Sequence, residues 1–393
     1  MKIVVKKPNT GDFLFMTALF LYTAEGLLSA SALSLIVPHL IFNGLSLLAL
    51  LLIIIKWFVT EKFNSTKFMV WIILFGVALI IVTKSSYTNL IILLSLLLSS
   101  QDVEFDTIIR NLFKWVFFWT AFIMILYFVG FLPDFTYSHF VDGQAKIVHS
   151  YGFKYYGGVA FSSMSLSIMY LYMRKNTKLW ENIIFLLINY WLYTLHTVRL
   201  VWISIVVFTI LNYLCEKTRF LDLNKRIYKF IATILPFAMF AFTLEMVKLY
   251  SEGKLTLGGS LETIETRLRY SVQAFEIYGV NMFGTYVKQY GGYAKYYLNS
   301  KTGFFVDSGY IYILIAYGII FAIMLMTIYT LLYRYIYETK NKKLYIWLGM
   351  VLVISVINNF LLSVYYCPII FYIPKMIRDV RGKRLKEQEQ LSD

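Results

Sequence analysis

The sequence predicts an all-α, polytopic membrane protein with about twelve transmembrane helices and one long outer loop that contains an amphipathic helix. Hydrophobic residues make up 59% of the 393 residues and charged residues only 15%, whereas a soluble domain of this size carries roughly a quarter charged residues. Apolar runs recur from Phe13 to Pro374. Since a helix needs ~20 mainly apolar residues to cross the ~30 Å hydrocarbon core of a bilayer, these runs indicate membrane spans.

We expect the last two spans to be joined by a turn at Asn358 and Asn359, and eleven spans with a broken last helix are the alternative. The sequence contains no internal repeat and no flexible linker, so residues 1–393 are expected to form a single integral membrane domain. The expected spans are 13–35, 38–58, 68–83, 86–100, 113–132, 156–173, 181–197, 200–214, 230–248, 307–333, 344–358 and 360–374.

The net charge of +15 is distributed along the chain in a way that predicts topology. Of the 37 Lys and Arg residues, 26 fall in segments on one side of the expected spans. This is the positive-inside bias, which places both termini in the cytoplasm and favours anionic lipid of the inner leaflet. A nucleic-acid-binding protein would gather these charges on one folded face, so we expect no nucleic-acid partner. The basic segments are 2–7, 56–67, 110–114, 174–178, 217–229, 334–343 and the tail from 375.

Metal and disulfide chemistry are not expected. Cys215 and Cys367 give neither a disulfide framework nor metal-ligand spacing, and the chain has only four histidines. The first apolar run is followed at once by further spans, so no cleavable signal peptide is expected either.

Three polar segments interrupt the apolar series. Residues 101–115 (QDVEFDTIIRNLFKW) are amphipathic and are expected to form an interfacial helix that leads into the fifth span. Residues 133–156 and the long loop 249–306 are expected on the non-cytoplasmic side. The long loop is neither apolar enough for a span nor rich enough in Lys and Arg for a cytoplasmic segment, so chemistry is expected there.

The long loop contains a predicted amphipathic helix, Leu261–Tyr278, because its apolar side chains share one helical stripe. Arg269 lies among acidic residues, with Glu265 four residues before it, the favourable order for an ion pair, so a solvated face is expected there. Arg267 lies on the other flank of the stripe with no carboxylate three or four residues away. Such an arginine either extends to water or binds an anion, and the sequence leaves both open.

Arg199 follows the seventh span in LHTVRLVWIS, at the outer edge of the membrane. Anchoring arginines gather on the cytoplasmic side, and a charge at this depth more often marks a functional site, so we favour a function for Arg199. Arginine binds phosphate through a planar fork of donors. Outward-facing arginines at membrane level therefore predict an anionic ligand at that level, such as a lipid-linked pyrophosphate.

Tyrosines gather in the long loop beside Gly291 and Gly292. A tyrosine ring and hydroxyl suit the faces and edges of sugars, and they equally suit the headgroup belt of a membrane, so both interpretations stay open. The cluster consists of Tyr286, Tyr290, Tyr293, Tyr296 and Tyr297.

A few other polar residues are candidates for chemistry. Asp307 opens the tenth span, where Asp is a favoured helix N-cap, and the same position suits a general base. His139, His149 and His196 lie on the same side, and isolated histidines are more often structural than catalytic. Glu25 lies within the first span and is expected to face protein rather than lipid.

Taken together, TRLRYSVQAFEIYGVNMFG and VDSGYIYILIAYGII resemble the signature around the large outer loop of Wzy-type bacterial polysaccharide polymerases. HSYGFKYYGGVAF resembles the Gly-Phe segment of that family, although the Asn that commonly follows is lacking. LHTVRLVWIS resembles its Thr-x-Arg element, with Arg199. The residues that match the outer-loop signature are Arg267, Gly279 or Gly284, Asp307, Tyr310 and Gly318, and those that match the Gly-Phe segment are His149, Gly152 and Phe153.

The resemblance implies a metal-independent glycosyltransferase of the bacterial cytoplasmic membrane that needs no cofactor. Its reaction moves a glycan from undecaprenyl pyrophosphate to a hydroxyl of the next lipid-linked repeat unit. The implied partners are that lipid-linked oligosaccharide, membrane lipid, a chain-length regulator and a flippase.

The resemblance also implies roles for individual residues. Arg199 and Arg267 would stabilise the leaving pyrophosphate. Asp307 or His149 would deprotonate or orient the acceptor hydroxyl. The expected substrate-binding residues are Arg269, Tyr270, Tyr278, Tyr290, Tyr293, Tyr296, Tyr297 and Tyr310.

Three other function classes, a ligase, a flippase and a non-catalytic factor, fit the sequence less well. O-antigen ligases share the architecture, but a ligase is expected to carry a histidine in its long outer loop and residues 251–306 contain none. A lipid-linked oligosaccharide flippase would want charges or helix breaks near the midplane in paired halves, which the spans do not show. A non-catalytic adhesion or assembly factor would leave the outward arginines unexplained.

Overall fold

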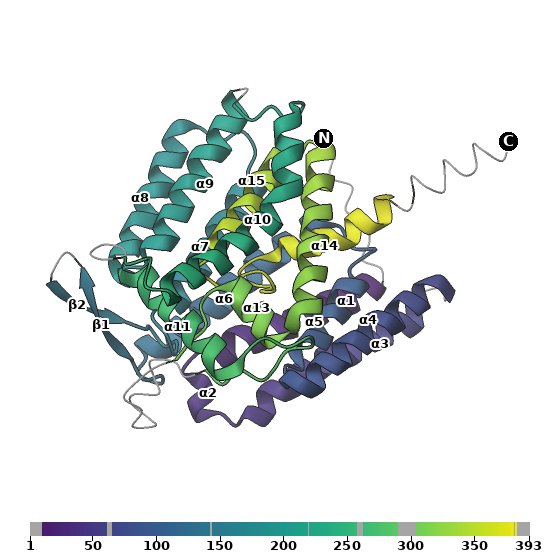
Figure 1. The fold of residues 1–393 in the computed structure, drawn as a ribbon, viewed down its shortest axis with the longest axis horizontal. Coiled ribbons are helices and arrows are strands. Elements are labelled where there is room, and N and C mark those ends of the chain that lie inside the picture. Colours follow the sequence, from purple (N-terminus) through teal and green to yellow (C-terminus); the bar gives the residue numbers. More distant parts are fainter. Residues whose placement is uncertain are drawn as a thin grey trace.

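The computed structural model is an all-α fold apart from one β-hairpin, and it describes residues 10–60, 65–141, 144–218, 220–257, 262–289, 304–380 and 382. Figure 1 shows α3 and α4 as an inclined pair at the lower right and the hairpin projecting at the lower left. The elements in chain order are α1 (Thr10–Ala30), α2 (Leu33–Ile36), α3 (His39–Thr60), α4 (Ser65–Ser85), α5 (Asn89–Ser99), α6 (Phe105–Phe128), β1 (Thr136–Val141), β2 (Gln144–His149), α7 (Gly157–Met173), α8 (Leu179–His196), α9 (Arg199–Lys217), α10 (Arg226–Ser251), α11 (Glu262–Tyr278), α13 (Gly309–Ala316), α14 (Gly318–Glu338), α15 (Lys342–Ile354), the 3-10 helix η2 (Pro368–Phe371) and a last helix, residues 372–380.

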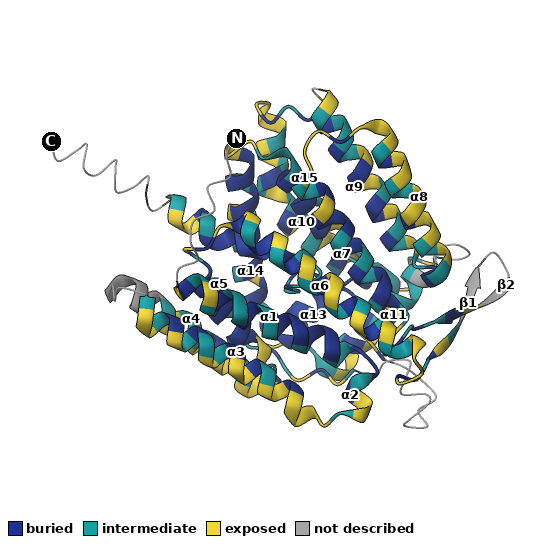
Figure 2. Ribbon diagram, turned by 180° about the vertical axis from the view of Figure 1, so that it is seen from behind, coloured by how far each residue is buried: buried dark blue, intermediate teal, exposed yellow. Residues whose placement is uncertain are grey.

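Six of the described helices, α1, α3, α6, α9, α10 and α14, are long and apolar enough to cross a membrane. Large apolar side chains stand exposed along the outer helices, for example Leu47 on α3 and Leu187 on α8. Figure 2 shows this exposed surface around a buried interior that includes α13. Continuous exposed apolar surface suits contact with lipid, so the chain is a helical, multi-pass membrane protein.

The expectation of twelve spans is met in part. Most of the predicted apolar runs contain a helix, but the run 307–333 is divided into α13 and α14 rather than forming one helix. The run 360–374 is not a regular span, because residues 355–367 form turns and are followed by η2. The fallback of a broken last segment is closer to what the structure contains.

The irregular segment 355–371 lies inside the protein. Phe360, Leu361 and Cys367 are at most 4% exposed. The carbonyl of Leu361 accepts a hydrogen bond from Tyr329, and that of Tyr365 accepts one from Ser165 at 2.6 Å. Non-helical backbone at membrane depth persists only where protein or water satisfies its polar groups. Here the side chains of Tyr329 and Ser165 provide such hydrogen bonds.

Two polar segments differ from expectation. Residues 101–115 do not form a separate interfacial helix, because α6 begins at Phe105 and runs without a break to Phe128. Residues 133–156, expected as an outer loop, contain the antiparallel β1–β2 hairpin, in which Thr136 pairs with His149.

The structure has two distinct ends. At the basic end, Lys343 contacts the carbonyls of Leu171 and Arg174 and the carboxylate of Glu216, which joins the ends of α7, α9 and α15. At the loop end, Ala32 donates to the Gly152 carbonyl at 2.8 Å, which joins the α1–α2 region to the segment after the hairpin. The loop end also carries α11 and the start of α13, at the bottom of Figure 1.

A break between α13 and α14 anchors the segment that follows α11. Gly318 has a φ of +90°, a left-handed conformation that glycine adopts without strain. Thr285 donates to the Ile315 carbonyl at 3.0 Å and Ile319 donates to the Asn281 carbonyl at 3.1 Å. These bonds use backbone groups that the interrupted helix leaves free, and they fix residues 281–285 across the break.

Candidate functional site

The candidate site is built on α11, which covers the loop end. The predicted amphipathic helix is confirmed over Glu262–Tyr278. Its buried face carries Leu268, Ser271 and Ala274, each at most 8% exposed, and it packs against α10 and α13. The packing of this face holds Arg267, one residue before Leu268, in a fixed position beside the start of α13.

Asp307 lies just before α13, in extended chain rather than in the cap. The N-cap is Ser308, whose hydroxyl accepts from the Ile311 amide at 3.5 Å. The expectation that Asp307 caps this helix is therefore wrong, because the next residue takes that position. The carboxylate of Asp307 is left to contact other side chains.

Arg267 and Asp307 form an ion pair across 40 residues of sequence. Nε of Arg267 donates to Oδ2 of Asp307 at 3.1 Å, and the two side chains are only 14% and 25% exposed. Burial raises the pKa of the Asp307 carboxyl above its ordinary value, and the charge and hydrogen bond of Arg267 oppose that rise. The guanidinium has five N–H donors, so the pair leaves most of them for an anionic ligand.

Two adjacent tyrosines lie close to this pair, on the connection between β2 and α7. Tyr155 and Tyr156 have ring centroids 4.3 Å apart, their hydroxyls hydrogen-bond to each other, and the charges of Arg267 and Asp307 act on both phenols. Tyr137 of β1 packs edge-on against Tyr155 at 5.8 Å. The arginine and carboxylate are thus bordered by a group of aromatic rings, of which Tyr155 is 40% exposed.

His149, the alternative base, lies at the end of β2. Its Nδ1 is paired with the carboxylate of Asp134, and Asp134 also accepts from the Ser150 amide at 3.1 Å. The His149 side chain is 45% exposed. This arrangement gives His149 a carboxylate partner of its own, Asp134, from the residues just before the hairpin.

Arg199 is the first residue of α9 and is exposed at the loop end. It follows Thr197, which has a φ of +53°, and Val198, whose amide donates to Nδ1 of the buried His196 at 3.1 Å. This tight connection between α8 and α9 holds Arg199 at the level of the loops rather than within the bundle.

The remaining substrate-contact candidates divide by position. The Tyr270 and Tyr278 rings lie 6.0 and 6.2 Å from that of Phe304, and the Tyr278 hydroxyl bonds the backbone of Lys288. The Arg269 guanidinium lies over the ring of Tyr270 at 5.6 Å. Tyr290, Tyr293, Tyr296 and Tyr297 lie outside the described residues.

Two expectations from the sequence are not met. Tyr310 is fully buried and its hydroxyl donates to the Leu352 carbonyl at 2.8 Å, so it is a packing residue and not part of the exposed site. The expected Glu265–Arg269 ion pair is replaced, because the Glu265 carboxylate accepts a hydrogen bond from Tyr250 at 3.5 Å.

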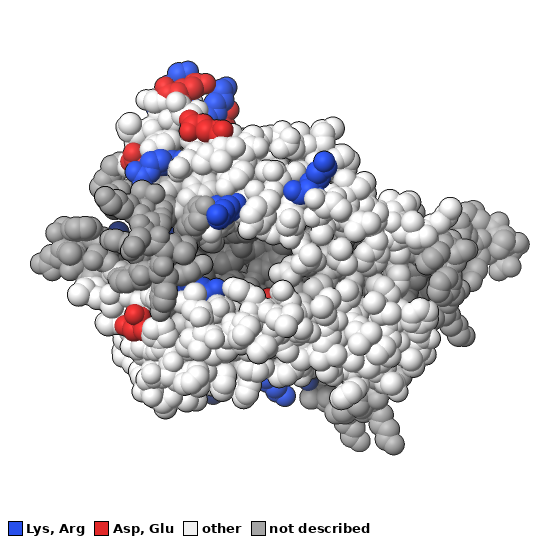
Figure 3. Space-filling view, turned by 90° about the horizontal axis from the view of Figure 1, so that it is seen from below, with Lys and Arg blue, Asp and Glu red and all other residues white. Residues whose placement is uncertain are grey.

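Figure 3 looks onto the loop end and shows a hollow near its middle with basic side chains around it. Acidic side chains are also visible on this face, most of them together with basic ones at the upper left of the view. Within the described part of the chain, no group of three His, Cys, Asp or Glu side chains is arranged to hold a metal ion. The chemistry that these residues can perform is electrostatic binding of an anion and acid–base work by a carboxylate.

Sequence reasoning missed Tyr155, Tyr156 and Asp134. The two tyrosines lie within a segment that was singled out for its Gly-Phe pattern, and their adjacency just before a helix was the available signal. Asp134 precedes β1 by two residues, and only the hairpin pairing brings it to His149.

Comparison with known proteins gives no match to a family model, to a curated protein or to a solved structure.

Proposed function

We propose that this protein is a polysaccharide polymerase that transfers a glycan from undecaprenyl pyrophosphate to a lipid-linked repeat unit at the outer face of the cytoplasmic membrane. The observation that carries the proposal is the Arg267–Asp307 ion pair, half-enclosed at the loop end with tyrosines beside it. An anion-binding group and a carboxylate side by side meet the two needs of this reaction.

The proposed orientation in the membrane comes from the distribution of charge. Lys and Arg residues dominate the basic end, and the positive-inside rule places that end in the cytoplasm. Both termini would then be cytoplasmic, the loop end would face outward, and the loop 249–306 would meet a headgroup carried on the outer leaflet. The tail 375–393 would lie inside.

The proposed chemistry is a displacement at the anomeric carbon of the donor sugar. The acceptor hydroxyl forms the new glycosidic bond while the bond from that carbon to the pyrophosphate oxygen breaks, and the electron pair leaves with the pyrophosphate. Arg267, with Arg199, stabilises the charge that grows on the leaving group. Asp307 takes the proton of the acceptor hydroxyl.

The environment of Asp307 suits this role. A carboxylate with an ordinary pKa is a weak base at neutral pH, and the burial that raises the pKa of Asp307 makes it a stronger one. Donor pyrophosphate would compete with Asp307 for the Arg267 guanidinium. Binding of the donor would thereby free the carboxylate to contact the acceptor.

The aromatic rings supply surfaces for sugars. Tyr155 is exposed and Tyr156 lies beside the charged pair, so an acceptor or donor sugar could pack on one ring while its hydroxyl approaches Asp307. Tyr270 and Tyr278 border the same loop end from α11.

The test is reconstitution of the purified protein with a lipid-linked repeat unit, followed by separation of products on a gel. The proposal predicts a ladder of lengthened glycans with the wild-type protein and none with Arg267→Ala. An unchanged ladder with Arg267→Ala would contradict the site. A failure of wild type to lengthen any lipid-linked glycan in cells that lack their own polymerase would contradict the function.

A further inference from the structure

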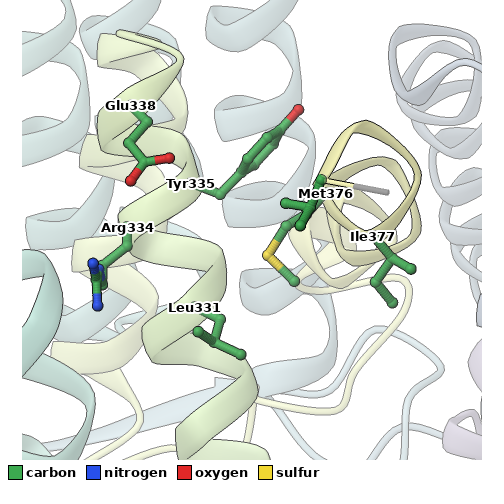
Figure 4. Close-up of a pocket in the computed structure, with 7 residues that line it drawn as sticks. Leu331, Arg334, Tyr335, Glu338, Met376 and Ile377 are labelled. Atoms are coloured by element: carbon green, nitrogen blue, oxygen red, sulfur yellow. The ribbon is translucent and has the colours of Figure 1, made fainter. Parts of the chain in front are cut away.

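A second candidate site lies at the opposite end of the molecule. A cavity of about 540 Å³ separates the last turns of α14 from the helix 372–380 (Figure 4). This volume lies within the ~300–1,000 Å³ that ligand pockets usually have. The cavity is lined by Leu331, Arg334, Tyr335, Glu338, Met376, Ile377 and Val380.

The lining changes from apolar to charged along α14. Leu331, Ile377 and Val380 are each more than 40% exposed, although they are apolar, which suits contact with hydrocarbon. Arg334 and Glu338 follow Leu331 toward the basic end and lie on neighbouring turns of α14. Successive turns are ~5.4 Å apart along the helix axis. The cavity, called the slot below, therefore has an apolar part beside Leu331, then a positive charge at Arg334, and then a negative charge at Glu338.

The other charges around the slot are engaged with protein groups. The Asp379 carboxylate accepts from the Tyr335 hydroxyl and lies 3.5 Å from Nε of Arg378. Arg378 also donates to the Gln101 carbonyl at 3.0 Å. By contrast, among the residues that the structure describes, Arg334 and Glu338 have neither a salt bridge nor a side-chain hydrogen bond, so both charges are open to a ligand.

We propose that this slot binds one molecule of phosphatidylethanolamine from the leaflet at the basic end. The phosphate would pair with Arg334, the primary ammonium with Glu338, and an acyl chain would lie along Leu331 and Ile377. In this lipid the phosphate lies nearer the acyl chains than the ammonium does. Arg334 likewise lies nearer Leu331 than Glu338 does, so the order of charges in the slot matches that of the headgroup.

The charge pattern selects against the other common headgroups. Phosphatidylglycerol carries no cation, so its binding would leave the Glu338 carboxylate without a positive partner. Phosphatidylcholine has a quaternary ammonium with no N–H to donate to the Glu338 carboxylate. Of the basic side chains that follow Glu338 in the chain, Lys340 donates to the Leu223 carbonyl and Lys343 pairs with Glu216, so both of these ammonium groups have partners within the protein.

Native mass spectrometry of the purified, delipidated protein tests this directly. Phosphatidylethanolamine, phosphatidylglycerol and phosphatidylcholine with identical acyl chains are added at equal concentrations. The proposal predicts a preference for phosphatidylethanolamine in the wild type. Arg334→Gln should weaken its binding about ten-fold, as expected for loss of one charged hydrogen bond.

The Glu338 variants distinguish recognition of the ethanolamine headgroup from nonspecific electrostatic attraction of lipid. Glu338→Gln should remove the preference for phosphatidylethanolamine over phosphatidylcholine, and Glu338→Lys should change the preference to phosphatidylglycerol. Arg110→Gln and Glu104→Gln, at exposed positions on and before α6, are the matched controls and should leave the order of affinities unchanged. Equal binding of the three lipids by the wild type, or a Glu338→Lys protein with the wild-type preference, would overturn the proposal.

Discussion

Arg267 and Asp307 illustrate how a site can be formed from residues with no local partner. Arg267 has no carboxylate three or four residues away on α11, and Asp307 is displaced from the N-cap by Ser308. Each is therefore available to the other when α11 packs beside α13. The pair is partly shielded from water, which strengthens its interaction and makes the loss of either partner costly.

Replacing Arg267 by Lys keeps the charge and removes the planar fork of donors. We expect Arg267→Lys to abolish long polymer, because a point charge does not reproduce bidentate contacts to a pyrophosphate. The measurement is the chain-length distribution of the product on a gel. Arg110→Lys, an exposed arginine of α6, serves as the control and should leave that distribution unchanged.

The proposed role of Asp307 as the base predicts that the rate of transfer depends on pH. Transfer requires the ionised carboxylate, so the rate should rise with pH as Asp307 loses its proton, and burial places this rise above the ordinary Asp pKa of ~3.9. Asp307→Asn should lower the rate roughly 10²–10⁴-fold and remove the rise.

His149→Gln decides between the two candidate bases. If Asp307 is the base, the rate–pH profile of His149→Gln keeps its acidic limb, since His149 is paired with Asp134 and not with Asp307. Loss of the limb in His149→Gln, with the limb retained in Asp307→Asn, would show that His149 is the base.

At the scale of elements, the site depends on two irregular connections. The first is the break at Gly318, which binds residues 281–285 and so fixes the C-terminal end of the α11 segment. The second is the β2–α7 connection, which places Tyr155 and Tyr156 beside the charged pair. Both are connections where backbone geometry, not hydrophobic pattern, decides the path of the chain.

Gly318→Ala should destabilise the protein. A Cβ at this position would lie 2.4 Å from the Gly284 amide nitrogen and 2.4 Å from the Met282 carbonyl oxygen, and φ is +90°. The left-handed conformation alone costs about 1–3 kcal/mol for a non-glycine residue. Thermal unfolding in detergent measures the loss, and Gly44→Ala is the control, because a Cβ there meets nothing within 4 Å. Equal melting temperatures for the two variants would refute the role of the break.

Tyr155→Ala tests the β2–α7 connection. Loss of an exposed ring beside the charged pair should raise the KM for the lipid-linked substrate about ten-fold, as expected for one stacking contact, with little change in melting temperature. Tyr170→Ala, which removes a ring of similar exposure from α7, should leave the KM unchanged. A KM unchanged by Tyr155→Ala would remove the tyrosine pair from the site.

At the scale of the whole molecule, the sequence predicted the class, the membrane character and the α11 helix. It also nominated both members of the Arg267–Asp307 pair, although it did not predict that they would touch. The division at Gly318 was hidden because the apolar run continues on both sides of it. Residues 355–371 were misassigned for the same reason, since burial in protein and burial in lipid select the same apolar side chains.

Tyr155 and Tyr156 were not predicted as site residues because tyrosine is abundant throughout this chain. Their importance comes from their closeness to the charge of Arg267, which is more than a hundred positions later in the chain, and no local pattern records this. Asp134 and His149 were likewise joined only by strand pairing.

The orientation of the loop end is the central claim of the proposed function, because donor and enzyme meet only if that end faces outward. Labelling of intact cells with a membrane-impermeant thiol reagent tests it, using single cysteines at the exposed positions Glu276 on α11 and Lys175 at the basic end. The native Cys215 and Cys367 are buried and give little background. We predict that Glu276→Cys is labelled from outside and that Lys175→Cys is labelled only after the cells are opened. The reverse pattern would contradict the proposed function.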